Sequence, residues 1–384
     1  MAAAGLATAV AQGRPRARDL GIRPGVGQTG PLNAITDVAG VLVGHSTVVA
    51  GDKVRTGVTA VLPHAGNLFR DKVPGAVFVG NAFGKLAGST QVNELGTIES
   101  PIVLTNTLAV GTAIEATVRW TLARAENENV RSVNALVGET NDGSLNDIRG
   151  LHVTGNHVMS AIANANTGPV EEGAVGAGTG TIAFGWKGGI GTSSRRVQEA
   201  KDEWTVGVLV QTNYGGRLTI AGVPVWRTLS PSRAARGVSP GGAGEGAGAA
   251  HYAAAGADGN VDRDGSCMII VATDAPLDAR DLKRLAARAI YAMARTGSTY
   301  SNGSGDFAVA FSTHPSLRAS TGTGPQARIV LPTDSLSGLF EAVMDATEEA
   351  IYNSLLKAVD TTGNGRTVRA LPVEALKELL KQRL

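Results

Sequence analysis

The sequence has little cysteine, few aromatic residues and no long apolar run, and these shortages exclude several classes of protein. Its single cysteine, Cys267, excludes a disulfide framework and a metal site made only of cysteines. No apolar run reaches the roughly 18 residues of a membrane span, so no membrane partner is expected. The 6 histidines form no HExxH motif and no close cluster, so neither a metal nor another cofactor is expected.

Net charge is also small. The 35 basic and 33 acidic side chains leave a net charge of +2 at pH 7, which argues against a nucleic-acid partner.

We expect a soluble protein of the cytoplasm or periplasm. Residues 1–12 contain Ala9-Val10-Ala11, which resembles a secretory cleavage site. The basic and apolar regions that precede such a site are missing, so a frayed N-terminal arm explains these residues equally well.

Glycine is the residue type in excess. The chain has 51 glycines in 384 residues and only 4% aromatics, a composition that favours sheets with tight turns and close backbone approaches. Residues 233–265 consist mainly of Gly, Ala, Pro and Ser. Such a segment cannot bury enough apolar surface to offset its ordering entropy, so the sequence predicts a flexible linker there.

Short strands and amphipathic helices are mixed along the rest of the chain. Strands are predicted at 35–43, 57–62, 132–137, 204–211, 267–273, 307–311 and 327–331. Helices are predicted at 107–125, 278–295, 335–359 and 372–384. The mixture lacks the steady alternation of a doubly wound sheet and favours a layered α/β sandwich.

The chemically informative feature is the end of the predicted linker, where Gly265 and Ser266 directly precede a buried strand. Cleavage of the bond between them would give Ser266 a free α-amine with a pKa of about 8, able to act as general base toward the serine hydroxyl. A glycine on the other side leaves the scissile carbonyl uncrowded. On this pattern alone, a plain domain linker followed by a strand is the commoner explanation.

Two other features have simple structural explanations. The glycines at 176, 178 and 180 lack the GxGxxG spacing and the acidic partner of a nucleotide-binding loop, so we expect them to permit close chain packing. Cys267 follows Ser266 on an apolar strand and would face the opposite side, as a buried structural thiol.

Several short stretches, in their shared order, are similar to a known family. They are RDLGI (18–22), ITDVAGV (35–41), NAFGK (81–85), GETNDG (138–143), GGIGT (188–192), DGS (264–266), ATDAP (272–276) and GSGD (303–306). With them the chain, over roughly residues 17–360, resembles the DmpA-type L-aminopeptidase/D-esterases, a family that includes the β-peptidyl aminopeptidases.

This resemblance implies an α/β (α+β) fold, a four-layered αββα sandwich like that of N-terminal-nucleophile hydrolases but with its own connectivity. It also implies self-cleavage into an α chain, residues 1–265, and a β chain, residues 266–384. The two chains would form one sandwich domain, and the mature protein would be a tetramer of such heterodimers.

The resemblance also implies roles for individual residues. Ser266 would be the nucleophile, while Ser304 and Asp306 would hold its α-amine and set its basicity. Asn213 would donate a hydrogen bond to the oxyanion. From the residues alone, a polar turn at 301–306 and an Asx turn at Asn213 explain the same pattern.

Two further residues would bind substrate. Glu139 matches a glutamate that binds the free amine of the substrate, although a solvated turn carboxylate is equally compatible with the sequence. Ser144 stands where some relatives carry an aromatic residue, which implies a roomier or more polar acyl pocket. Asp306 stands where the β-peptidyl members carry glutamate, so preference for β-amino acids stays open.

The sequence therefore predicts a self-processing serine aminopeptidase with amidase and esterase activity. It would release N-terminal residues from short peptides, amides and esters through an acyl-enzyme on Ser266. An acyltransferase resembling the ornithine acetyltransferases is an alternative, but those enzymes use threonine. A glycine-rich binding protein without enzymatic activity is the third possibility, with 233–265 as a plain linker.

Overall fold

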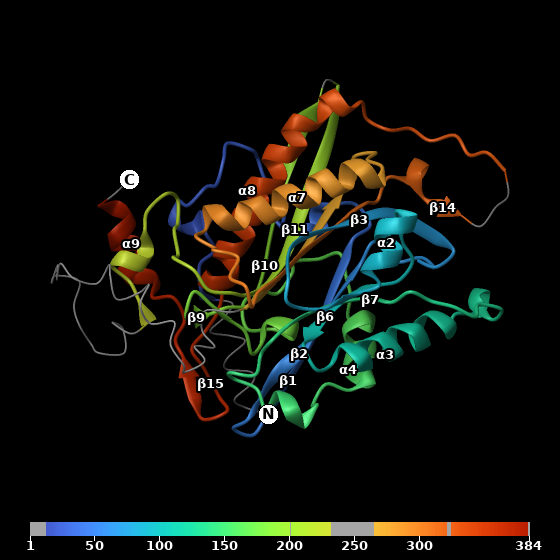
Figure 1. Cartoon of the computed structure of the whole chain (residues 1–384). Helices are drawn as coiled ribbons and strands as arrows, with labels where there is room; N and C mark the ends of the chain where they lie inside the picture. Colours follow the sequence, from blue (N-terminus) through green and yellow to red (C-terminus); the bar gives the residue numbers. More distant parts are fainter. Residues whose placement is uncertain (1–12, 200, 232–264, 321–323, 383–384) are drawn as a thin grey trace.

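Two β-sheets lie face to face, and helices cover the outer face of each (Figure 1). The computed structural model describes residues 13–199, 201–231, 265–320 and 324–382. The predicted signal remnant, and all of the predicted linker except Gly265, lie outside these residues. The layering is that of the predicted αββα sandwich, which is confirmed.

The first sheet has the strand order β1-β2-β6-β7-β4. Its strands are β1 (Leu42–Ala50), β2 (Val54–Leu62), β6 (Ile102–Asn106), β7 (Leu136–Thr140) and β4 (Leu86–Ala87). Helices α3 (Val110–Leu122) and α4 (Gly155–Ala163) cover its outer face. Because β6 and β7 are parallel, their carboxyl ends meet at the same edge of the sheet.

The second sheet has the main strand order β10-β11-β12-β13-β3-β14. Its strands are β10 (Ile190–Glu199), β11 (Asp202–Asn213), β12 (Ser266–Thr273), β13 (Gly305–Ser312), β3 (Asp71–Ala82) and β14 (Ala319–Ser320), with β5 (Thr97–Ile98) also pairing with β3. Helices α7 (Ala279–Arg295) and α8 (Ser337–Leu356) cover its outer face.

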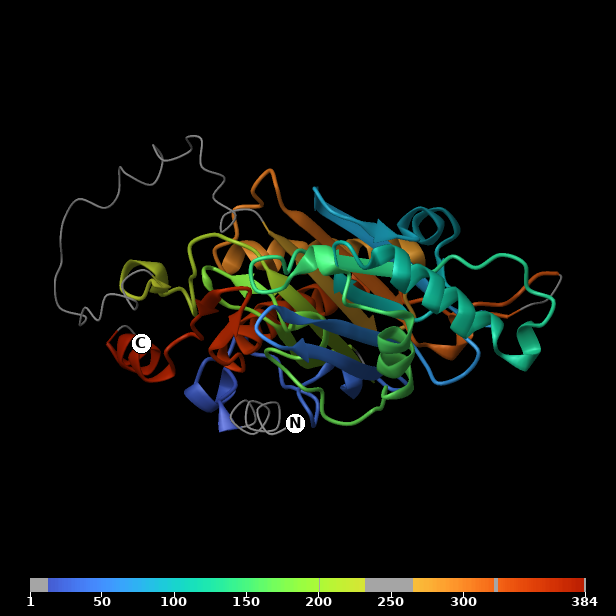
Figure 2. The same ribbon diagram turned by 90° about the horizontal axis from the view of Figure 1, so that it is seen from below.

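The remaining elements are short. They are α2 (Ser89–Leu95), α9 (Val373–Lys381), the hairpins β8 (Ile182–Ala183) with β9 (Trp186–Lys187) and β15 (Thr361–Gly363) with β16 (Arg366–Val368), and 3-10 turns at Arg18–Leu20, Ile35–Asp37, Ala125–Asn127, Ile148–Gly150, Gly176–Gly178, Val225–Arg227, Pro315–Leu317 and Thr333–Leu336. The red helix α9 lies at the opposite end of the molecule from α3 (Figure 2).

The central strand β12 is buried along its whole length. Cys267 and Ile269 face the apolar layer under the helices, whereas Met268 and Ile270 face the layer between the two sheets. Each fully buried aliphatic side chain of this kind contributes about 1.5–3 kcal/mol. The predicted orientation of Cys267 is confirmed, and burial raises the pKa of its thiol well above the usual value.

Helix α7 begins where the sequence predicts it. The carboxylate of Asp278 accepts a hydrogen bond from the backbone of Asp281 and caps the first turn, while Arg295 lies in the last turn. Its buried face packs on β3, β13 and α8, so α7 fixes the outer surface of the sheet that carries β12.

One predicted strand is wrong, and two others are displaced. The strand predicted at 35–43 begins only at Leu42, because residues 35–37 form a 3-10 turn in which the Asp37 carboxylate accepts from the backbone N–H groups of Leu32 and Ala34. At 327–331 the chain is not a strand, and the side chains of Ile329 and Val330 stay exposed. The strand predicted at 132–137 begins only at Leu136.

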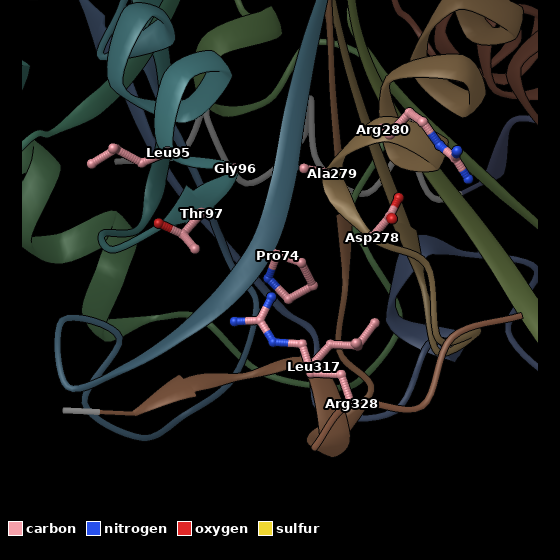
Figure 3. Close-up of a pocket in the computed structure, with 9 residues that line it drawn as sticks. All are labelled: Pro74, Leu95, Gly96, Thr97, Asp278, Ala279, Arg280, Leu317 and Arg328. Atoms are coloured by element: carbon pink, nitrogen blue, oxygen red, sulfur yellow. The ribbon is translucent and has the colours of Figure 1, made fainter. Parts of the chain in front are cut away.

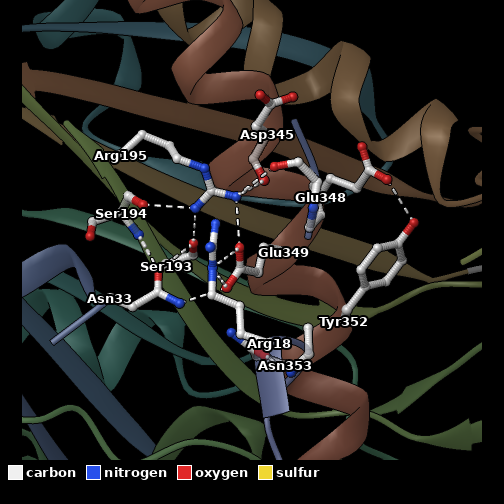
Figure 4. Close-up of polar contacts among 12 residues, drawn as sticks. Arg18, Asn33, Ser193, Ser194, Arg195, Asp345, Glu348, Glu349, Tyr352 and Asn353 are labelled. Carbon is white, nitrogen blue, oxygen red and sulfur yellow. Dashed lines mark hydrogen bonds and ion pairs between the residues drawn. The ribbon is translucent and has the colours of Figure 1, made fainter. Parts of the chain in front are cut away.

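A buried ionic network ties the N-terminal segment to the second sheet and α8 (Figure 4). Arg195 Nη2 and Glu349 Oε2 are 2.6 Å apart, and both side chains are fully buried. Arg18 donates to the other carboxylate oxygen of Glu349, and Asn33 donates to that same oxygen. One carboxylate therefore joins β10, α8 and the segment that precedes β1.

Replacing Glu349 with glutamine should destabilise the protein by about 3–5 kcal/mol, because the change leaves a buried guanidinium without its counter-charge. Urea unfolding, followed by tryptophan fluorescence, measures this loss. The matched control is Glu374→Gln, which breaks an exposed pair with Lys377 on α9 and should cost less than about 1 kcal/mol. Equal losses in the two variants would contradict the structural role given to the buried pair.

Candidate active site

The candidate residues gather at one end of the sandwich, where β12 and β13 begin and β11 ends. Ser266 pairs with Asn213 of β11 on one side and with Gly305 of β13 on the other. The carboxyl ends of β6 and β7 lie across from this point, because Gln211 Nε2 donates to Thr105 O and Thr140 Oγ1.

Ser266 and Gly265 are both buried at the head of β12. The backbone N–H of Gly305 donates to Gly265 O at 3.0 Å and lies 3.3 Å from Ser266 Oγ. A Cβ atom on Gly265 would lie 1.9 Å from the carbonyl oxygen of Asn213, so a side chain does not fit at position 265. Contacts with β11 on one side and β13 on the other therefore fix the position of the peptide bond between Gly265 and Ser266.

Ser304 and Asp306 lie together at the start of β13. Ser304 Oγ donates to Asp306 Oδ1 at 2.8 Å, and both side chains are buried. Burial raises the pKa of Asp306 to about 6, although the hydrogen bonds from Ser304 and from the backbone of Cys267 act in the opposite direction. Asp306 Oδ2 has no hydrogen-bond partner among the described residues.

A β-bulge and an asparagine orient this pair. Asp306 pairs with Asn81 but Phe307 pairs with Val79, so Gly80 of β3 is left unpaired. Bulges of this kind redirect side chains next to active sites. Asn81 Nδ2 donates to Ser304 O at 2.5 Å and fixes the turn before β13.

The amide of Asn213 is held by two segments distant in sequence. Its Oδ1 accepts from the backbone N–H of Ile182 at 2.9 Å, and its Nδ2 donates to Asn141 O at 3.0 Å. These long-range contacts replace the local Asx turn that the sequence also allowed. Because an amide nitrogen carries two hydrogens, Nδ2 keeps a second donor for another acceptor.

Glu139, at the end of β7, is a buried carboxylate and not a solvated turn residue. Its Oε1 accepts from the backbone N–H of Lys85 at 3.0 Å, and its Oε2 accepts from the hydroxyl of Thr107. The ammonium of Lys85 lies 3.5 Å from Oε1. A Cβ on Gly84 would lie 3.4 Å from Glu139 Oε1 and 3.2 Å from Gly305 Cα, so Glu139 is close to the head of β13.

Ser144 is the candidate that the structure does not bring into the cluster. It lies half-buried in the turn after β7 and makes no hydrogen bond within the described part of the chain. Its neighbour Asn141 touches Asn213, so Ser144 belongs to an adjoining loop.

A cavity of about 240 Å³ lies elsewhere (Figure 3). Pro74 of β3 and Asp278, Ala279 and Arg280 at the start of α7 are among the residues that line it. In β3, Gly75 pairs with Phe311, whereas Ala82 pairs with Gly305 next to the candidate site. Seven residues of strand separate the two positions by roughly 20 Å, so this cavity is not part of the cluster.

Several groups that contribute to the candidate site were not predicted from the sequence. They are the backbone N–H of Gly305, the hydroxyl of Thr107, the ammonium of Lys85 and the side chain of Asn81. Asn81 and Lys85 stand in the stretch 81–85 that supports the family resemblance, which was a usable signal. The Gly305 amide and Thr107 had no local signal, because their roles arise only when strands pair.

No group of three or more His, Cys, Asp or Glu side chains able to hold a metal ion occurs in the described ranges. In the same ranges, no helix is both long and apolar enough to cross a membrane.

The αββα layers, with Ser266 at the head of a central strand and the Ser304–Asp306 pair beside it, are the features expected of a hydrolase of the N-terminal-nucleophile type. The model of peptidase family S58 matches residues 33–368. The chain therefore belongs to peptidase family S58.

Individual relatives agree with this assignment. The β-peptidyl aminopeptidase BapA of Sphingosinicella microcystinivorans is 44% identical over 390 residues, covering 98% of this chain and 94% of that protein. The structure of a Burkholderia sp. β-aminopeptidase is 39% identical with a TM-score of 0.82 and covers 96% of this chain and 99% of that chain.

A third relative is the L-aminopeptidase D-ala-esterase/amidase from Ochrobactrum anthropi, whose structure is described as a new variant among the Ntn hydrolase fold. It is 36% identical with a TM-score of 0.83, and the match covers 96% of this chain and 99% of that chain. The chain is thus a hydrolase with aminopeptidase function.

Proposed function

We propose that the chain cleaves itself between Gly265 and Ser266 and then works as an aminopeptidase with Ser266 as its N-terminal nucleophile. The observation that carries this proposal concerns Asp306, whose buried Oδ2 has no hydrogen-bond partner among the described residues. Asp306 pairs with Cys267, the residue directly after Ser266. In the uncut chain the nitrogen of Ser266 belongs to a neutral peptide bond. Cleavage would turn it into an amine, whose protonated form can neutralise the carboxylate.

Self-cleavage needs only groups at the head of β12. Ser266 Oγ attacks the carbonyl carbon of Gly265, the C–N bond breaks, and the serine nitrogen takes up the proton. The Gly305 N–H, which donates to Gly265 O, can stabilise the negative charge that develops there. Water then hydrolyses the ester, leaving a carboxylate on Gly265 and a free hydroxyl and amine on Ser266.

Turnover repeats this chemistry on a substrate. The α-amine of Ser266 takes the proton of its own hydroxyl while Oγ attacks the carbonyl of the N-terminal residue. The second hydrogen of Asn213 Nδ2 stabilises the oxyanion. The amine returns the proton to the leaving group, and water hydrolyses the acyl-enzyme. Ser304 holds Asp306, and Asp306 holds the amine.

The substrates that we propose for this enzyme are short peptides, amides and esters with a free N-terminal amine. Support comes from relatives named as β-peptidyl aminopeptidases and as an L-aminopeptidase D-ala-esterase/amidase. Glu139 would bind the substrate ammonium, in the position that Lys85 now approaches to 3.5 Å. Ser144 would adjoin the acyl group, and the cleaved chains would assemble as a tetramer of αβ heterodimers.

Intact mass measurement and N-terminal sequencing of the purified protein test the proposal. We expect two chains, with the smaller one beginning Ser266-Cys267-Met268. A single full-length chain that hydrolyses aminopeptidase substrates would overturn it. Formation of free product in the absence of an added acyl acceptor separates hydrolysis from acyl transfer.

Replacing Asp306 with asparagine should move the acidic limb of the kcat/KM–pH profile to lower pH. A nearby carboxylate favours the protonated amine, so its removal lowers the pKa of the Ser266 amine, and the neutral base persists to lower pH. The pH profiles of the two processed enzymes measure the shift.

The matched control for this change is Asp274→Asn. Asp274 is also a carboxyl whose pKa is raised by burial, but it follows the far end of β12. Its replacement should leave the acidic limb where it is. An unchanged or upward-moving limb in Asp306→Asn would show that Asp306 does not contact the amine.

A further inference from the structure

Lys187 is a buried cation that the proposed steps do not use. It ends β9, its side chain is fully buried, and its Nζ donates to Gly178 O at 2.9 Å and to Gly188 O at 2.7 Å. Burying an ammonium costs several kcal/mol unless hydrogen bonds and an opposite charge compensate. A lysine in such a place therefore calls for an explanation.

The two carbonyls flank the β8–β9 hairpin, because Gly178 precedes β8 and Gly188 follows β9. Between them, Ile182 of β8 donates its backbone N–H to Asn213 Oδ1. The ammonium of Lys187 thus joins the two ends of the segment that holds one side of the Asn213 amide. A Cβ on Gly188 would lie 2.6 Å from Thr212 O, so this segment packs directly on the backbone residue before Asn213.

The opposite charge lies on the second segment that holds Asn213. Asn141, which accepts from Asn213 Nδ2, is followed by Asp142, a buried carboxylate that accepts from Asn146 Nδ2 at 3.0 Å. A Cβ on Gly180 would lie 2.9 Å from Asp142 Cβ, so the hairpin touches this segment. Both segments that bind the Asn213 amide therefore carry a buried charge.

Asp142 also affects the protonation of Lys187. Burial lowers the pKa of Lys187 to about 7, and the carboxylate of Asp142 acts to raise it. Burial raises the pKa of Asp142 to about 6, and its hydrogen bonds act to lower it. This interaction favours the ionised lysine and adds to the contact between the hairpin segment and the 141–146 segment.

We propose that Lys187 is a positioning residue for the oxyanion donor, one that aims the Asn213 amide by fixing the hairpin that binds its oxygen. The proposal rests on the oxyanion role proposed for Asn213. Lys187 touches no reacting atom and acts through Gly178, Gly188 and Ile182. Its loss should therefore impair transition-state binding with little effect on substrate affinity.

A double-mutant cycle tests this coupling. Processed Lys187→Met should lose roughly 10- to 100-fold in kcat with KM nearly unchanged, because the donor stays present but is misdirected. Adding Lys187→Met to Asn213→Ala should slow the enzyme no further, since no donor remains to be aimed. Lys187→Gln, which keeps an N–H donor for the glycine carbonyls, should recover part of the kcat.

The control is Lys72→Met, which removes a partly buried lysine that pairs with Glu99 at the far end of β3. It should keep the wild-type kcat. If Lys187→Met does not fold, Lys187→Gln takes its place in the cycle, with a smaller expected loss.

Two outcomes overturn the proposal, and only the second also overturns the oxyanion role of Asn213. One outcome is that Lys187→Met lowers the kcat of Asn213→Ala by the same factor by which it lowers the wild-type kcat, or that it leaves the wild-type kcat unchanged. In either case Lys187 does not position Asn213, while the oxyanion role stands. If Asn213→Ala alone keeps the wild-type kcat, the oxyanion role itself fails.

Discussion

Purified Ser266→Ala should be one uncut chain without aminopeptidase activity. The change removes the only atom proposed to attack the Gly265 carbonyl, and the uncut chain then has no free amine at the head of β12. Alanine fits the strand, because Ser266 is buried and pairs through its backbone with Asn213 and Gly305. Denaturing gels and intact mass report processing, and release of an amine or alcohol from a synthetic substrate reports activity.

Ser312→Ala is the matched control for this result. Ser312 is also a buried serine on the second sheet, but it ends β13 and donates to Ala275 O. That variant should be cleaved and active. If Ser266→Ala is still cut between 265 and 266, the attacking group is another one and the proposed nucleophile is wrong.

Asn213→Ala should lower kcat by about 10²–10³, with a smaller change in KM. The reason is that the free N–H of its amide meets a full negative charge only in the transition state. Processing should slow as well, because self-cleavage passes through a similar oxyanion. Steady-state kinetics on the fully processed variant measures the loss.

Asn213→Asp separates the donor from the shape of the side chain. An ionised aspartate keeps an oxygen to accept from Ile182 but has no N–H to donate. It should therefore be at least as slow as the alanine variant. A processed Asn213→Ala enzyme with normal kcat would remove this residue from the site.

Parts of the fold with a local cause were predictable. The apolar run of β12 and the stripe of α7, capped by Asp278, carry their signals within a few residues. The strand predicted at 35–43 begins late, at Leu42, because the Asp37 carboxylate accepts hydrogen bonds from nearby backbone donors, a competition that β-branched composition does not reveal. The strand predicted at 327–331 failed because a strand needs a partner, and the choice of partner is not local.

The residues of the candidate site also divide into those with a local signal in the sequence and those without one. Gly265 and Ser266 stood out because their pattern is contiguous, and the family resemblance supplied Ser304, Asp306 and Asn213. The resemblance implied what these side chains would do, but not which other segments of the chain hold them in place.

The proximity of Glu139 to the head of β13 depends on how two sheets pack through Gly84. Lys187 could not be singled out, because nothing near it in sequence distinguishes a buried lysine from a solvated one. Charges whose neutralising partners come from distant segments become visible only in three dimensions.

The strand order of the second sheet has a consequence for folding. Strands β10, β11 and β3 precede residue 265 in the chain, whereas β12 and β13 follow it. After cleavage, two neighbouring strands of one polypeptide would remain inserted between strands of the other. Refolding of the unfolded mature enzyme would become a second-order reaction that slows on dilution, while the precursor folds in first order. The mature protein would therefore depend on slow unfolding for its persistence, a kinetic stability acquired when the bond is cut.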